Sequence, residues 1–167
     1  DGNLLAAGKW LLSKYDDYGR PFSSGLHTGA NPDPNNAALT YSEQHTATTY
    51  GTSGINLGKV TGSQTWMPGN TSIARTFTYD AVTGRMLTDN GPNHLTNNSG
   101  SDNYTFTYDY AGNRLTETCA HKTSTASATL TLATRNTYDH AGRSNALYHK
   151  INTNAERQLA SYAYDFR

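Results

Sequence analysis

The sequence predicts an all-β protein made of repeated antiparallel β-hairpins. Two observations lead to this fold class. A short motif of Tyr-Asp, variable residues, glycine and arginine recurs at a nearly regular spacing, which is typical of a repeat architecture. Apolar and threonine residues alternate before the motif, and a period of two residues indicates half-buried β-strands.

The motif occurs four times and begins a fifth time near the end of the sequence. It predicts hairpin turns at 15–20, 79–85, 108–114 and 138–143, and a truncated repeat from 164. Its members are Tyr15, Asp16, Gly19 and Arg20; Tyr79, Asp80, Gly84 and Arg85; Tyr108, Asp109, Gly112 and Arg114; Tyr138, Asp139, Gly142 and Arg143; and Tyr164 and Asp165. We interpret Asn113 as an extra residue before Arg114.

Each motif has the chemistry of a tight hairpin turn. Aspartate favours the first position of a type I turn, because its carboxylate accepts hydrogen bonds from the amides that follow. Glycine favours the last position, where the backbone is left-handed, and this combination forms a hairpin loop with a β-bulge. We expect Arg20 to stack on Tyr15 across its own hairpin, and Arg143 on Tyr138. Each pair would contribute roughly 0.5–1 kcal/mol.

The flanking residues predict the strands. Tyr104, Phe106 and Tyr108 alternate with threonines, and the segments 75–79 and 129–138 show the same period. β-Branched and aromatic residues at that period favour a pleated, half-buried strand. The chain has 12 tyrosines and 15 glycines, and its hydrophobic fraction is only 35%. We therefore expect sheet with little helix.

The segments between the motifs are less regular. Prolines and asparagines predict a loop over 26–40, and similar residues predict connecting loops over 62–73 and 89–103. Residues 47–54 resemble a hairpin that has lost its aspartate. A weak helical pattern covers 155–160.

We assign 1–167 to one segment of repeats, with an irregular or degenerate repeat over 26–76. The sequence ends inside a repeat, so we expect a segment of a much larger protein.

Charge and composition exclude several classes of function. Basic and acidic residues are equal in number, at 13 each, and no basic cluster suggests nucleic-acid binding. No apolar run has the length that a membrane span needs, so we expect no membrane insertion. The single cysteine excludes an intrachain disulfide.

No residue pattern points to catalysis. The six histidines lack the spacing of metal ligands, and the turn aspartates supply too few carboxylates for a calcium site. Cys119 has only His121 nearby as a base, so a small strand residue is the favoured interpretation. We expect no catalytic residue, cofactor or metal. Aromatic side chains could instead form a platform for sugars, and the exposed candidates are Tyr18 and Tyr110 in turns and Trp66 in a loop.

The Tyr-Asp-x-x-Gly-Arg units resemble the YD repeats of the RHS family, whose relatives include the B and C components of insecticidal toxin complexes and the teneurins. Two further stretches, Gly8-Lys9-Trp10 and Asn56–Gly62, are similar to RHS proteins of Bacteroidetes-type bacteria. The family also has a self-cleaving aspartyl core, but no stretch here matches it. We therefore assign no catalytic role to this chain.

The resemblance implies a fold and a function. Successive hairpins would wind as a spiral β-sheet and form part of a shell that encloses or presents a toxin or other polypeptide. The implied partners are the remainder of the repeat shell, the enclosed polypeptide, and bacterial secretion machinery or surface proteins. It also implies a secreted or cell-surface bacterial protein, with type IX secretion as the export route. The alternative is an adhesin or carbohydrate-binding surface module.

Overall fold

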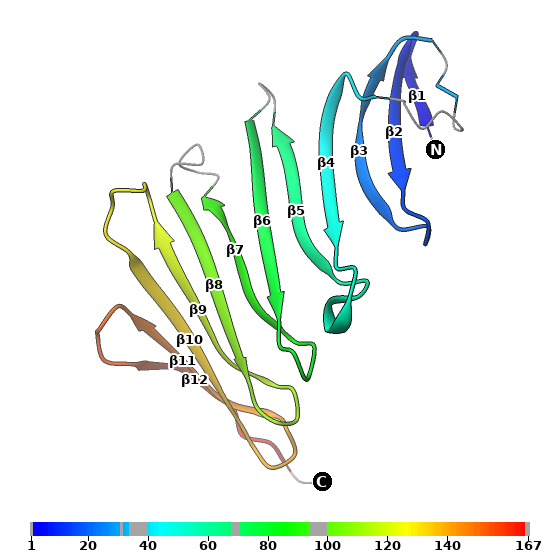
Figure 1. The fold of residues 1–167 in the computed structure, drawn as a ribbon. Coiled ribbons are helices and arrows are strands. Elements are labelled where there is room, and N and C mark those ends of the chain that lie inside the picture. Colours follow the sequence, from blue (N-terminus) through cyan, green and yellow to red (C-terminus); the bar gives the residue numbers. More distant parts are fainter. Residues whose placement is uncertain (1, 31, 34–39, 68–70, 94–99, 166–167) are drawn as a thin grey trace. The chain divides into compact units, whose positions relative to one another are not determined.

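The computed structural model describes residues 2–30, 32–33, 40–67, 71–93 and 100–165. In this part of the chain the regular structure is almost entirely β-strand, with one three-residue 3-10 helix, η1 (Gly54–Asn56) (Figure 1). The all-β fold class and the repeated antiparallel hairpins are thus confirmed.

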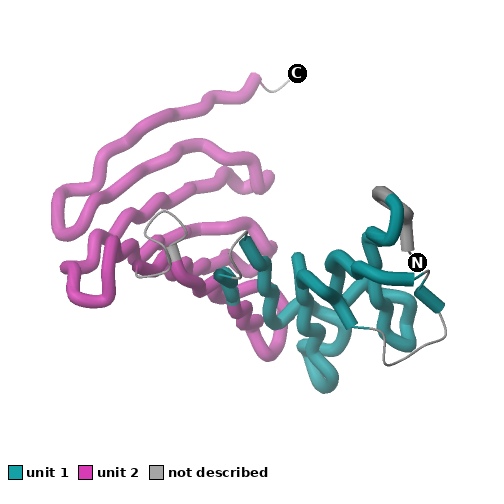
Figure 2. The backbone as a smooth tube through the Cα atoms, turned by 90° about the horizontal axis from the view of Figure 1, so that it is seen from above, with its two compact units in different colours: residues 1–75 teal, residues 76–167 magenta. Residues whose placement is uncertain are grey.

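The chain divides into two compact units, residues 1–75 and 76–167 (Figure 2). The boundary lies inside strand β6 (Thr71–Tyr79). The other strands of the first unit are β1 (Gly2–Ala6), β2 (Lys9–Tyr15), β3 (Pro21–Thr28), β4 (Glu43–Tyr50) and β5 (Val60–Met67). Those of the second unit are β7 (Met86–Asn93), β8 (Gly100–Tyr108), β9 (Arg114–Lys122), β10 (Leu130–Tyr138), β11 (Ser144–Ile151) and β12 (Arg157–Ser161).

Within each unit the strands pair in the order of the sequence, and the pairs are antiparallel. The predicted turns join β2 to β3, β6 to β7, β8 to β9, and β10 to β11. In each of these hairpins the pairing register shifts at the motif tyrosine, which is the predicted bulge. The turn glycines have φ of +68° to +101°, so they adopt the left-handed backbone that the motif predicts: Gly19, Gly84, Gly112 and Gly142.

The interpretation of 47–54 as part of a degenerate hairpin is confirmed. β4 and β5 pair with a register shift at Tyr50, the position of the tyrosine in the other hairpins. A longer turn that contains η1 replaces the aspartate turn. The Gly51 amide donates to the Lys59 carbonyl, and the Gly58 amide donates to the Gly51 carbonyl, at 2.8 and 3.0 Å.

Four sequence-based expectations are wrong in part. The expected loops over 62–73 and 89–103 contain most of β5 and parts of β6, β7 and β8. The weak helical pattern over 155–160 falls largely on β12, and β3 extends to residue 28 inside the loop expected over 26–40. Hydrogen bonds to neighbouring strands override local preference in these polar segments. The loop expected over 26–40 also includes residues 34–39, which lie outside the described residues.

Very little of the sheet is buried. Among the described residues, the buried side chains are Leu12, Ser23, Cys119 and Ala146. Most strand residues are half-buried or exposed, and large apolar side chains such as Leu57 and Leu159 are more than half exposed. Neither unit has a described second layer packed on its sheet, although a compact domain usually buries one layer against another.

Candidate functional site

The aspartate turns are closed by the aspartate side chain itself. In the first turn, Asp16 Oδ1 accepts hydrogen bonds from the amides of Tyr18 and Arg20, at 3.0 and 2.9 Å. Its second carboxylate oxygen accepts from Arg20 Nε at 2.7 Å. The Asp139 turn repeats this pattern with Arg143, whose Nε donates to Asp139 Oδ2 at 2.8 Å. One aspartate therefore fixes both the turn backbone and the arginine.

The Asp109 turn uses an amide in place of the guanidinium. Asn113 Nδ2 donates to Asp109 Oδ2 at 2.9 Å, and the Asn113 amide donates to Oδ1 at 2.8 Å. Asn113 therefore occupies the place of Arg20 and Arg143, which differs from our interpretation of it as an inserted residue. Arg114 is the first residue of β9 and forms an ion pair with Glu117 at 2.6 Å.

The second turn has one more residue between its aspartate and its glycine than the other turns, and its arginine reaches the next turn. Asp80 Oδ1 accepts hydrogen bonds from Val82 and Thr83. Arg85 Nη1 instead donates to the Asp109 carbonyl at 2.8 Å, and Nη2 donates to the Tyr110 carbonyl at 3.3 Å. The second turn is thus attached to the third.

Hydrogen bonding lowers the pKa of all four turn carboxyls. The main cause is the guanidinium of Arg20 for Asp16 and the side chain of Asn113 for Asp109. For Asp80 and Asp139 the main cause is a backbone amide, that of Thr83 or Arg143. Each carboxylate is thus a stable acceptor at neutral pH, and none has the raised pKa of a general acid.

A second feature recurs between neighbouring repeats. The hydroxyl of a motif tyrosine, or of Tyr50 at the corresponding position, donates to a carbonyl of the preceding hairpin. The acceptor is the second residue after that hairpin's turn glycine. We call this hydrogen bond the tyrosine link. It joins Tyr50 to Pro21 at 2.9 Å, Tyr108 to Met86 at 2.9 Å, Tyr138 to Arg114 at 2.8 Å and Tyr164 to Ser144 at 2.7 Å.

The turn arginines lie over these same tyrosine rings. The guanidinium carbon of Arg20 is 4.2 Å from the centroid of Tyr50, and that of Arg143 is 4.4 Å from Tyr164. Arg85 lies 5.8 Å from the centroid of Tyr108. We expected Arg20 to stack on Tyr15 and Arg143 on Tyr138; each instead lies over the tyrosine of the following hairpin. Arg20 also lies 5.0 Å from the centroid of Tyr18 in its own turn. The β-bulge redirects the side chains at the turn, and strand alternation alone does not reveal this.

The tyrosine link was missed by sequence reasoning, although its parts were recognised. It depends on a backbone carbonyl, and every residue type has one. The useful signal is the constant offset of two residues after the turn glycine. Tyr50 fits this pattern, and so identifies the degenerate hairpin despite its missing aspartate.

Two of the three aromatic candidates for ligand contact are exposed. Tyr18 is 80% exposed and Tyr110 is fully exposed, both at the tips of turns. Trp66 is half-buried and lies in β5, so its expected place in a loop is wrong. His140 occupies an exposed turn position.

A histidine, an aspartate and the cysteine meet on β8 and β9. Asp102 and His121 are directly opposite each other, and His121 Nδ1 lies 2.6 Å from Asp102 Oδ1. Cys119 Sγ lies 4.0 Å from the same carboxylate oxygen. A carboxylate next to a buried thiol opposes ionisation to the thiolate, so this arrangement does not favour a nucleophilic cysteine. Strand register brings the three together, and sequence spacing does not show it.

Among the described residues, no cluster of three or more histidine, cysteine, aspartate or glutamate side chains could hold a metal ion. No helix in that part of the chain is both long and apolar enough for a membrane crossing. No protein-family model matches the chain, and no curated protein matches it significantly.

Proposed function

We propose that this chain is a structural segment of a large secreted or surface protein of the RHS type. Its YD-repeat sheet would form part of the wall of a shell that encloses or presents a toxin or other polypeptide. The observation that supports this proposal best is the tyrosine link, which recurs at one offset in four hairpins. No reaction is assigned to the segment.

The link supports a repeating wall because one hairpin can supply both halves of it. The hairpin of β8 and β9 donates through Tyr108 to Met86 and accepts at Arg114 from Tyr138. A hairpin that donates one tyrosine link and accepts another can be followed by further hairpins with the same contacts. This nearest-neighbour arrangement is how repeat proteins extend a structure that one repeat could not stabilise alone.

Low burial supports the same proposal. A sheet with so few buried side chains gains little from apolar burial, at roughly 25 cal/mol per Å². Hydrogen bonds between hairpins, and contacts with further protein on the sheet faces, would then supply much of the stability. A wall with an outer face and an enclosed polypeptide on its inner face meets this requirement.

The test is to isolate the natural protein that contains this sequence, determine its mass, and image it by electron microscopy. We expect a chain of many such hairpins arranged as a hollow particle. An internal polypeptide should resist protease until the particle is opened. A protein that is little longer than this sequence, or an open sheet with no interior, would overturn the proposal.

A second candidate is an adhesin or carbohydrate-binding module that uses the turn tips. The exposed rings of Tyr18 and Tyr110 favour it, because aromatic faces stack on sugars. The test is a glycan array with the purified chain and a Tyr18→Ala, Tyr110→Ala variant. Binding that is lost in a folded variant supports this function, and an absence of glycan binding eliminates it.

A further inference from the structure

The strand β12 is the most exposed strand of the second unit. Four of its five residues are exposed, and Ala160 alone is half-buried. Its pairing with β11 is interrupted by a register shift at Tyr148, and no other described strand pairs with it. Segments with few buried contacts are the first to open locally in a folded protein. The side-chain contacts around β12 therefore decide how firmly this strand is held.

The turn between β11 and β12 is attached to β10 at two places that differ in chemistry. Just after β11, the Asn152 amide donates to the Thr131 carbonyl and the Asn152 side-chain oxygen accepts from the Thr131 amide, both at 2.8 Å. Just before β12, Glu156 accepts hydrogen bonds from Nε and Nη2 of Arg135, at 3.0 and 2.5 Å. The attachment beside β11 is neutral, whereas the attachment beside β12 is an ion pair.

Arg135 is oriented by a tyrosine before it meets Glu156. Arg135 and Tyr148 lie directly opposite each other on β10 and β11, and the guanidinium carbon is 4.1 Å from the ring centroid. Two parallel hydrogen bonds to one carboxylate are stronger and more specific than a single contact. The Arg135 and Glu156 side chains are 38% and 34% exposed, so water screens the pair only in part.

The charges around Glu156 come from two strands. Arg135 approaches from β10, and Lys150 of β11 adds a second positive charge. Arg157 pairs with His149 across β12 and β11, and this pair lies on the opposite face from Lys150, because neighbouring strand residues alternate. Hydrogen bonding to Arg135 is the main cause that lowers the pKa of Glu156 from its ordinary value of 4.5. The contribution of the ion pair to stability is therefore present above the unfolded pKa and is lost as pH falls through the folded pKa.

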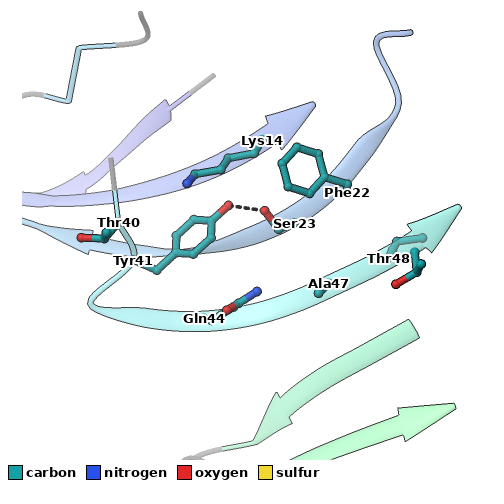
Figure 3. Close-up of a pocket in the computed structure, with 9 residues that line it drawn as sticks. Lys14, Phe22, Ser23, Thr40, Tyr41, Gln44, Ala47 and Thr48 are labelled. Carbon is teal, nitrogen blue, oxygen red and sulfur yellow. Dashed lines mark hydrogen bonds between the residues drawn. The ribbon is translucent and has the colours of Figure 1, made fainter. Parts of the chain in front are cut away.

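The first unit attaches a segment before a strand without an acidic group. Tyr41, just before β4, extends toward β3, and its hydroxyl forms a 2.8 Å hydrogen bond with the hydroxyl of Ser23 (Figure 3). The two residues line an open pocket of about 570 Å³, where the Lys14 ammonium lies 5.1 Å from the centroid of the Tyr41 ring. None of the nine lining residues is acidic. This attachment gains no proton in acid, whereas the carboxylate of Glu156 does.

We propose that β12 is a strand that acid releases: the Arg135–Glu156 ion pair holds it against β11 at neutral pH, and protonation of Glu156 opens it. The tyrosine link from Tyr164 to Ser144 is neutral and persists, so the opening is confined to β12. Once β12 opens, β11 becomes the edge of the described sheet. Its unpaired N–H and C=O groups can then pair with another extended chain. The inference does not depend on the proposed shell, because it concerns one hairpin of the second unit.

The test is hydrogen exchange of the full chain, expressed as protection factors so that the pH dependence of intrinsic exchange is removed. At neutral pH, Glu156→Gln imitates the protonated carboxyl and should lower the protection of the β12 amides about fivefold. The protection of β9 and β10 should stay as in the parent chain. Glu117→Gln is the matched control, because it removes the carboxylate of the Arg114–Glu117 ion pair in β9 and should leave β12 unchanged.

The pH profile then separates release by protonation from a general structural role. In the parent chain, the protection of β12 relative to β10 should fall as pH decreases from neutral to below the folded pKa of Glu156. In Glu156→Gln this ratio should already be low and should not change with pH. The parent profile needs no variant, so it does not depend on the folding of a substituted chain.

Three results would overturn the proposal. The first is unchanged protection of β12 in Glu156→Gln at neutral pH. The second is an acid response of β12 that persists in this variant, because another group would then be responsible. The third is an equal loss of protection in β9, β10 and β12, since the ion pair would then support the whole unit rather than hold one strand.

Discussion

The turn between β2 and β3 and the turn between β4 and β5 each close a β-hairpin, but different groups form the hydrogen bonds that close them. In the first, Asp16 accepts two backbone amides and the Arg20 guanidinium. In the second, no aspartate is present, and backbone hydrogen bonds around η1 close a longer loop. Yet the tyrosine at the end of the preceding strand keeps its position at the bulge in both hairpins.

This difference separates two roles that the motif combines. The aspartate and glycine shape one turn, and another loop can replace them. The tyrosine joins neighbouring hairpins, and Tyr50 does so without an aspartate in its own turn. The Asp109 turn supports the same conclusion, since Asn113 replaces the arginine while the link from Tyr138 to Arg114 persists.

The largest effect should follow removal of a linking tyrosine. We expect Tyr108→Ala and Tyr50→Ala each to lower the free energy of unfolding by about 2–3 kcal/mol, since each loses half-buried aromatic surface and a hydrogen bond. Urea unfolding measures the loss. Tyr110→Ala is the control: its exposed ring should change stability by less than about 0.5 kcal/mol. A Tyr50→Ala variant as stable as the control would show that the degenerate hairpin is held in another way.

Next in size should be alanine at the turn glycines. Gly112 has φ +101°, and a Cβ there would lie 2.8 Å from Arg85 Nη2. Gly112→Ala should therefore cost about 1–2 kcal/mol, because it combines backbone strain with displacement of Arg85. Gly142→Ala has φ +75° and an ordinary 3.6 Å contact, so it should cost less. Urea unfolding of both variants tests whether Gly112→Ala costs more than Gly142→Ala. Equal losses of stability would show that the displacement of Arg85 contributes nothing.

Acid should weaken the aspartate turns. The carboxyl pKa values of Asp16 and Asp139 are lowered from 3.8 in the folded chain, mainly by Arg20 and Arg143. Their contribution to stability is therefore present above the unfolded pKa and is lost as pH falls through the lower folded values. Urea midpoints measured from neutral pH to below the folded pKa values should fall less steeply in an Asp16→Asn, Asp139→Asn variant. Asp17→Asn removes a carboxylate that is not the turn acceptor, and its pH profile should match the parent.

The smallest effect should come from the stacked arginine. Arg143 lies over Tyr164, and a partly exposed cation–π contact is worth about 0.5–1 kcal/mol. An Arg143→Lys variant keeps the charge but loses the planar group that stacks on the ring and binds Asp139. Thermal unfolding should show a small decrease. A decrease in stability as large as that of Tyr108→Ala would show that the arginine, and not the tyrosine hydroxyl, contributes most to the contact between neighbouring hairpins.

The sequence predicted the local chemistry better than the contacts between hairpins. Alternation identified the strands before Tyr79, Tyr108 and Tyr138, and Asp with Gly identified the turns. These features depend on neighbours along the chain. The strands inside 89–103 were missed because Gly91 and Pro92 disfavour a strand locally, while pairing with Asp102 and Ser101 stabilises one.

The partner of the arginine could not be predicted for the same reason. It depends on which neighbouring hairpin meets the turn after the bulge, and two-residue alternation contains no such information. The Asp102–His121 pair and the pocket around Tyr41 likewise depend on register between strands, which the residue types alone leave open.

The central claim is that the tyrosine link stabilises the contact between neighbouring hairpins whether or not the turn of the donor hairpin has its aspartate. The most direct test compares Tyr50→Phe with Tyr108→Phe, each of which removes one hydroxyl and keeps the ring. We predict that both lower the free energy of unfolding by about 1 kcal/mol, whereas Tyr110→Phe leaves it unchanged. Urea unfolding of the parent chain and the three variants measures these free energies. No loss in either variant, or a loss only at Tyr108 where the turn has its aspartate, would contradict the account.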